Sequence, residues 1–162
     1  MQQKHKLGVV RPTTSKVLES LMATLEPYLE GARVLDLFAG TGSVGLAAHK
    51  LGANEVVFVE GHPKLAAALR ARIPAGCSVL AQPLPGGLSR LTGTFDLILA
   101  APPYGSPDGP ATLAALGQLL ATDAWVVVEH HHKDNYPDRL PGLSLERRRR
   151  FGETALSYYR AT

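Results

Sequence analysis

The stretch from Val34 to Gly45, VLDLFAGTGSVG, constrains the fold of this chain more than any other. It begins with a short apolar run that holds one carboxyl group, Asp36, and turns through Gly40 and Gly42. A buried strand, a glycine turn and a helix start, in that order, form the first unit of a doubly wound α/β sheet. We expect Ser43 to cap the helix. Such a turn binds a nucleotide-like ligand, because glycine permits close approach of the backbone and the helix start offers unpaired N–H groups.

Helix and strand patterns alternate through most of the chain. A helix is predicted over residues 17–25, ahead of the glycine stretch, and Pro27 and Gly31 close it. Further helices are expected at 43–51, 63–72 and 111–120, strands at 55–59, 78–81, 95–100 and 125–129, and a β-hairpin from 143–151 and 154–159. We therefore predict one α/β domain over residues 1–162, with residues 1–30 as a segment and helix before the first strand. Its expected core is a Rossmann-like, mostly parallel sheet with helices on both faces and a C-terminal antiparallel hairpin.

Composition and charge narrow the class of protein. The chain has 162 residues, a net charge of +3 and one cysteine, Cys77, which has no internal disulfide partner. It contains no apolar run long enough to cross a bilayer and no secretory signal, so we expect a cytoplasmic protein without membrane contact. The run Arg147–Arg150 indicates a polyanionic partner such as nucleic acid. A solvated, charge-protected edge strand explains the same run equally well.

The glycine turn and one carboxyl group predict a nucleotide-like ligand. Gly40, Gly42 and Gly45 satisfy G-x-G-x-x-G between a strand and a helix. Glu60 ends the following strand, where a carboxylate accepts hydrogen bonds from both hydroxyls of a ribose. These features fit a nicotinamide dinucleotide and S-adenosylmethionine alike, since both carry an adenosine ribose.

Two other features favour S-adenosylmethionine. Asp36 lies near the carboxyl end of its strand, where it would repel a pyrophosphate and attract the amino group and sulfonium environment of S-adenosylmethionine. The alternative is that N–H groups of the loop satisfy this carboxylate. The tetrad Ala101–Tyr104, APPY, follows the strand at 95–100, and its paired prolines hold a rigid loop over the ligand crevice. A nicotinamide oxidoreductase has no use for either feature.

Through these residues and further segments, the chain resembles the bacterial small-subunit (16S) ribosomal RNA guanine-N2 methyltransferases of the RsmD type. The resemblance covers nearly the whole chain, and its segments are RPTTSKVLESLM at 11–22, DLFAGTGSVGLAA at 36–48, VFVE at 57–60, FDLILAAPPY at 95–104 and VVVE at 126–129. The RPTT segment makes the match specific, because the glycine motif and the proline tetrad occur generally in amino-methylating enzymes. The resemblance implies S-adenosylmethionine as cofactor and small-subunit ribosomal RNA or an assembling ribosomal subunit as partner. We expect a monomer.

The resemblance also implies roles for particular residues. Those expected around the cofactor are Asp36, Phe38, Gly40 and Gly42 at its methionine portion, Glu60 at the ribose, Gln82 at the adenine, and Arg11 and Thr13, which would border the cofactor or the RNA. Those expected at the target base are Ala101, Pro102, Pro103 and Tyr104. There the first side chain of the tetrad and the Pro102 carbonyl would accept hydrogen bonds from the guanine amine, while Tyr104 stacks on the base. We expect no metal site, and we expect His130, His131 and His132 to lie in a solvated loop.

The chain departs from the family pattern at Ala101, where relatives carry Asp or Asn. Alanine accepts no hydrogen bond, and losing one preorganised partner costs about 100-fold in rate. Asp96 stands at the far end of the same strand, whereas Asp108 in the following loop is a candidate replacement. Two functions follow: a methyltransferase acting on a guanine exocyclic amine of small-subunit ribosomal RNA, or a catalytically impaired relative that acts as an RNA-binding protein.

Overall fold

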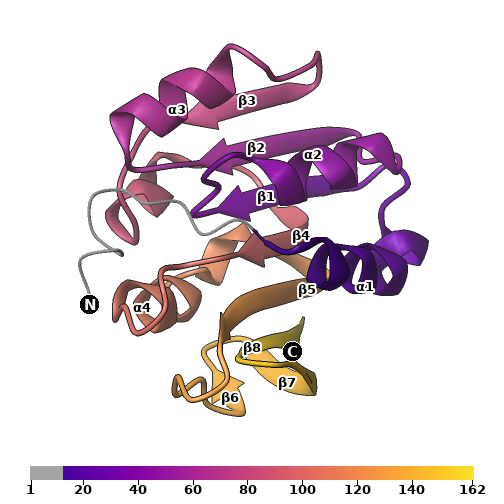
Figure 1. Cartoon of the computed structure of the whole chain (residues 1–162), viewed down its shortest axis with the longest axis vertical. Coiled ribbons are helices and arrows are strands. Elements are labelled where there is room, and N and C mark those ends of the chain that lie inside the picture. Colours follow the sequence, from indigo (N-terminus) through magenta and orange to yellow (C-terminus); the bar gives the residue numbers. More distant parts are fainter. Residues whose placement is uncertain (1–12) are drawn as a thin grey trace.

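The computed structural model describes residues 13–162 (Figure 1). Its α-helices are α1 (Ser15–Leu25), α2 (Ser43–Lys50), α3 (Pro63–Arg70) and α4 (Asp108–Ala114), and its 3₁₀ helices are η2 (Glu26–Tyr28), η3 (Gly86–Arg90) and η4 (Gly117–Leu119). Its strands are β1 (Arg33–Leu37), β2 (Glu55–Val59), β3 (Cys77–Leu80), β4 (Phe95–Ala100), β5 (Leu120–His131), β6 (Arg139–Leu140), β7 (Leu143–Phe151) and β8 (Thr154–Ala161). Within this part of the chain, no helix has both the length and the apolar character needed to cross a membrane.

All eight strands form one sheet in the order β3-β2-β1-β4-β5-β8-β7-β6. Neighbours from β3 to β5 run parallel, and β5, β8, β7 and β6 pair antiparallel. Figure 1 shows the arrowheads of β1 to β4 at the same edge of the sheet. The strand order reverses between β1 and β4, and ligands of open α/β sheets bind at such a switch point, outside the carboxyl ends of the strands. The predicted Rossmann-like fold with its C-terminal hairpin is confirmed.

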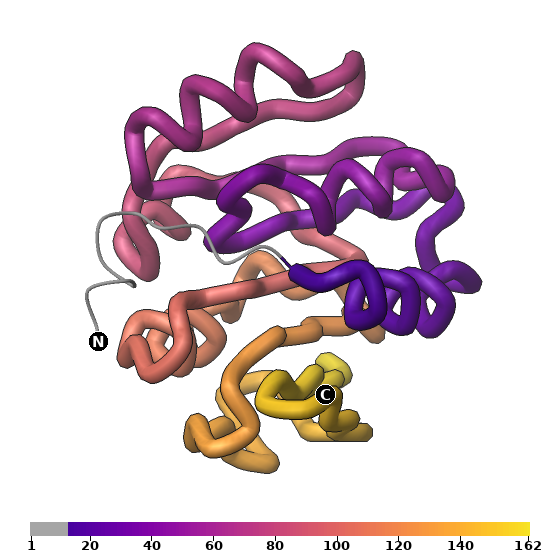
Figure 2. The backbone as a smooth tube through the Cα atoms, in the orientation of Figure 1, coloured from indigo at the N-terminus to yellow at the C-terminus, as the bar shows by residue number. Residues whose placement is uncertain are grey.

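Helices cover both faces of the sheet, which explains why its central strands are almost wholly apolar. Successive side chains of a strand point to opposite faces. In β2, Phe58 packs with Leu25 of α1 and Leu69 of α3 on one face, whereas Val57 packs with Leu113 of α4 on the other. The chain trace in Figure 2 places the C-terminal hairpin beside β5, at the end of the molecule opposite α3 and β3.

Two local predictions about helices were wrong. The helix expected at 111–120 begins at Asp108 and ends at Ala114, and η4 follows it as a separate turn. Apolar residues spaced by three fit a 3₁₀ turn as well as an α-helix, so the pattern did not fix where the helix ends. Ser43 does not cap α2: Gly42 occupies the N-cap in a left-handed conformation, without a side-chain hydrogen bond.

The histidines at the end of β5 lie in the sheet rather than in a solvated loop. β5 extends to His131, because β8 pairs with it as far as His131 and Thr154. His130 is buried, and its Nε2 lies 2.7 Å from the Ser157 hydroxyl of β8. The expectation of a solvated loop over His130 and His131 is therefore wrong, since the neighbouring strand continues past the apolar residues.

Candidate active site

The glycine turn after β1 holds a conformation that only glycine adopts without strain. Gly40 and Gly42 have φ angles of 59° and 80°, and the Gly42 N–H donates to the Ala39 carbonyl at 2.8 Å. A Cβ on Gly42 would lie 2.5 Å from Cδ1 of Leu69. This turn sets the backbone of the β1–α2 connection close to the body of the protein at the carboxyl edge of the sheet.

Glu60 joins the glycine turn to the loop that follows β2. Its two carboxylate oxygens accept from the Gly40 N–H at 2.7 Å and from the His62 N–H at 2.8 Å, and the side chain is 9% exposed. A carboxylate has about four acceptor sites, so these two contacts leave capacity for hydroxyl donors. The position predicted for a ribose contact therefore holds a fixed, nearly buried carboxylate beside the turn.

The Asp36 carboxyl group lies under the first turn of α2. Its Oδ2 accepts from the Gly45 N–H at 2.9 Å. Burial is the main cause that raises the pKa of Asp36 to about 8; the Gly45 N–H opposes the shift and the nearby Glu60 charge adds to it. Gly45 must lack a side chain, because a Cβ there would lie 2.8 Å from the same oxygen. The loop N–H contact weighed as an alternative is thus present at one oxygen, while the carboxyl group also lines the pocket described below.

The tetrad leaves β4 at the switch point itself. The Ala101 N–H donates to the Leu37 carbonyl at 3.2 Å, which keeps the tetrad's first residue beside β1. Pro102 is buried and Pro103 is exposed. The Tyr104 hydroxyl lies 2.5 Å from Thr154 Oγ1 in β8, so the antiparallel hairpin holds the end of the tetrad.

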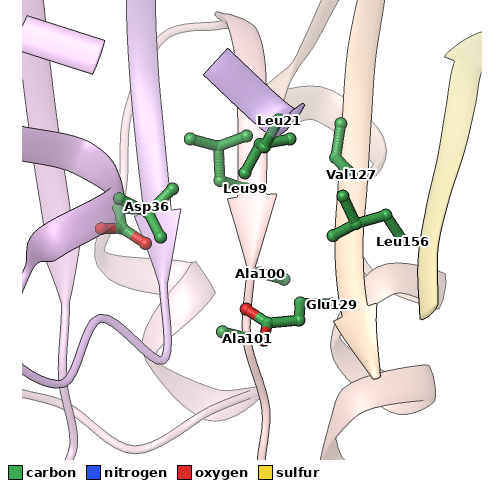
Figure 3. Close-up of a pocket in the computed structure, with 9 residues that line it drawn as sticks. Leu21, Asp36, Leu99, Ala100, Ala101, Val127, Glu129 and Leu156 are labelled. Carbon is green, nitrogen blue, oxygen red and sulfur yellow. The ribbon is translucent and has the colours of Figure 1, made fainter. Parts of the chain in front are cut away.

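Glu129 completes a pocket between the ends of β1, β4 and β5. The carboxyl groups of Asp36 and Glu129 line this pocket together with Ala101, and apolar side chains form its remaining walls (Figure 3). Glu129 is 5% exposed, and its Oε1 accepts from the Thr13 hydroxyl at 2.6 Å. A nearly buried carboxyl group therefore stands beside the tetrad residue that lacks a polar side chain.

The remaining predicted site residues divide between the two sides of the switch point. Phe38 follows β1 with a φ of 57° and packs partly against the core. Gln82 follows β3, and its carbonyl lies near Gly61, next to Glu60. Thr13 contacts the end of β5 through Glu129. Arg11 lies outside the described residues.

Neither aspartate considered beside Ala101 fills its place. Asp96 is at the opposite end of β4, where it accepts from the Arg33 N–H at 2.9 Å. Asp108 begins α4 and is exposed. Glu129 belongs to the VVVE segment of the resemblance but was not among the predicted site residues. The available signal was a carboxyl group at the end of a buried strand, the same signal that identified Glu60.

The run Arg147–Arg150 lies exposed on β7. Some of these arginines also serve the fold: Arg148 donates to the Ser157 hydroxyl and to the Tyr136 carbonyl, both at 2.7 Å. The run therefore combines an exposed basic strand with local structural contacts. Among residues 13–162, no group of three or more His, Cys, Asp or Glu side chains could hold a metal ion.

The fold is that of the Rossmann-like methyltransferases. Solved structures that share the fold at under 25% identity include S-adenosylmethionine-dependent methyltransferases. The "Putative methyltransferase yhhF" of Escherichia coli superposes with a TM-score of 0.84 at 26% identity, covering 94% of this chain and 87% of that one.

The chain belongs to the family described as "Conserved hypothetical protein 95", the family of the RsmD-type methyltransferases, whose model matches residues 3–160. The "Putative rRNA methyltransferase YlbH" of Bacillus subtilis (strain 168) is 31% identical over 161 residues, covering 93% of this chain and 87% of the relative. The "Ribosomal RNA small subunit methyltransferase D" of Escherichia coli (strain K12) is 28% identical over 156 residues, covering 93% of this chain and 79% of the relative.

Proposed function

We propose that this protein transfers the methyl group of S-adenosylmethionine to the exocyclic amine of a guanine in small-subunit ribosomal RNA. The observation that carries the proposal is that the glycine turn with Glu60 and the APPY tetrad lie on the two sides of one switch point. This arrangement supports a cofactor on the β1 and β2 side and a target base on the β4 side. The curated relatives named above supply the RNA class.

The residues on the β1 and β2 side fit S-adenosylmethionine. Glu60 offers a fixed carboxylate for the ribose hydroxyls, and Gly40 and Gly42 let the methionine portion approach the backbone closely. Asp36 is a buried carboxyl group whose pKa is raised, so a positively charged amino group nearby would stabilise its ionised form. When bound, S-adenosylmethionine supplies a methyl group on a positively charged sulfur.

On the β4 side, the chain positions the target guanine and does not need a strong proton acceptor to activate its amine. The lone pair of a guanine amine is delocalised into the ring, so the amine is a poor nucleophile. Hydrogen-bond acceptors that hold its N–H groups turn the lone pair toward the methyl group, while a stacked ring fixes the base at attack distance. We assign the holding of the amine N–H groups to the Pro102 carbonyl together with another acceptor. We assign the stacking on the guanine ring to Tyr104.

The test is transfer of labelled methyl from S-adenosylmethionine to small ribosomal subunits that lack the modification, followed by mapping of the labelled nucleotide. We expect N2-methylguanosine as the labelled product. Label on another nucleotide or position would overturn the guanine assignment. If calorimetry shows no binding of S-adenosylhomocysteine, the assignment of S-adenosylmethionine as the cofactor is overturned.

A second function is favoured by one observation: Ala101 has no polar side chain at the position where the family resemblance implies a hydrogen-bond acceptor. On this alternative the protein binds ribosomal RNA without transferring a methyl group. Ala101→Asp separates the two. If label appears only with this variant, the parent chain is an inactive relative that binds RNA.

A further inference from the structure

We propose that Glu129 supplies the hydrogen-bond acceptor for the target amine that Ala101 cannot supply. This inference rests on the proposed methyl transfer and assigns a catalytic residue on a different strand of the same site. It starts from the sheet register. Leu99 of β4 is in register with Val127 of β5, and the residues two positions further along, Ala101 and Glu129, lie on the same face as this pair. Adjacent strands are about 5 Å apart, so the Glu129 side chain can span the distance to the Ala101 position.

The pocket confirms that these two residues face the same space. Both line the pocket at the carboxyl ends of β1, β4 and β5. In Figure 3 the Glu129 carboxyl group extends from β5 toward the end of β4, where Ala101 lies. A side-chain acceptor at position 101 would project into this space. The small Ala101 side chain does not fill the space, and the longer Glu129 side chain reaches into it.

The chemistry of Glu129 suits an amine donor. A carboxylate only accepts hydrogen bonds and has about four acceptor sites, one of which takes the Thr13 hydroxyl. That contact fixes the carboxyl group, which is 5% exposed, and a fixed acceptor in a site shielded from water stabilises a developing positive charge strongly. As the nitrogen–carbon bond forms, the carbon–sulfur bond breaks with its electron pair on sulfur. The proton leaving the amine passes to the Glu129 carboxylate and from there to water.

The experiment compares the parent with Glu129→Gln, Ala101→Asp and the double variant in the labelled-methyl assay on small subunits. In Glu129→Gln the single amide oxygen accepts from Thr13 and the NH₂ group faces the amine, so we expect transfer to fall about 100-fold. The double variant should recover most of that loss, because its aspartate again places an acceptor beside the target amine. Glu55→Gln, which changes a carboxyl group paired with Arg33 at the other edge of the sheet, is the matched control and should transfer like the parent.

A binding measurement provides a readout independent of transfer. With S-adenosylhomocysteine present, the probe is a single-stranded oligoribonucleotide containing one guanosine, compared with the same strand containing inosine, which lacks the exocyclic amine. The parent should bind the guanosine strand about tenfold more tightly or better, because a hydrogen bond to a charged group is worth more than a neutral one. In Glu129→Gln that preference should disappear, while S-adenosylhomocysteine binds with unchanged affinity.

Each outcome decides between the proposals. If the parent transfers methyl and Glu129→Gln transfers equally well, the Glu129 role is overturned and the methyltransferase function stands. If Glu129→Gln loses affinity for S-adenosylhomocysteine, or if Ala101→Asp does not rescue it, Glu129 acts on the structure rather than on the amine. If only variants with Ala101→Asp transfer, Glu129 does not supply the acceptor and the parent is inactive. If no variant transfers and no preference for guanosine exists, both proposals fail.

Discussion

The buried Asp36 carboxyl group is expected to make this protein less stable as the pH rises. The side chain is 3% exposed, and burial is the main cause that raises its pKa from 3.8 to about 8. Between these two values the folded protein holds a proton that the unfolded chain has released. The free energy of unfolding contributed by this group therefore falls by about 1.4 kcal/mol per pH unit, and by about 3 kcal/mol between about pH 5 and about pH 7.

Urea unfolding of the parent and of Asp36→Asn over this pH range measures the effect. Asparagine does not titrate, and its amide oxygen still accepts from the Gly45 N–H. The parent should lose stability relative to the variant as the pH rises. The difference between their free energies of unfolding should therefore change by about 1.4 kcal/mol per pH unit. Curves that run parallel would show that Asp36 is ionised in the folded protein, and would refute the reasoning. Loading the parent with S-adenosylhomocysteine should flatten its curve if the ligand's amino group pairs with Asp36.

Two further predictions concern packing and the base platform. A methyl group in Gly45→Ala would lie 2.5 Å from Cε1 of Phe58, and this overpacking should lower the free energy of unfolding by about 1–3 kcal/mol in urea. Gly86→Ala, where nothing lies within 4 Å, should change it by less than about 1 kcal/mol, and equal effects of the two would contradict the packing argument. Tyr104→Phe removes the hydroxyl that contacts Thr154 but keeps the ring, so methyl transfer should stay within about tenfold of the parent, whereas Tyr104→Ala should lose about 10- to 100-fold in RNA affinity. If Tyr104→Phe and Tyr104→Ala lose RNA affinity equally, the hydroxyl contact matters and the ring does not stack.

Neighbouring strands limited what could be predicted about individual residues. Adjacent side chains of a strand point to opposite faces, so the pattern in β8 predicts that only one of Tyr158 and Tyr159 is buried. Each of them is 1% exposed or less. They are buried together because β8 lies between β5 and β7, with apolar clusters on both faces of the sheet. His130 belongs to β5 and is buried because β8 pairs with β5 at this position. Burial at such positions depends on a strand from another part of the chain, and a local pattern does not contain that strand.

The sequence by itself determined the fold class and predicted the half of the candidate site that is built from consecutive residues. The glycine turn, Glu60 at the end of its strand and the APPY tetrad are local patterns, because turn geometry and strand alternation depend on near neighbours in the chain. Only the tertiary structure decided what stands beside Ala101. Glu129 reaches that position through the pairing of β4 with β5, two strands separated in sequence by α4 and η4. Spacing along the chain does not show which side chains share a face at the edge of a sheet. The register of the strands and the crossover connections set the distance between those side chains.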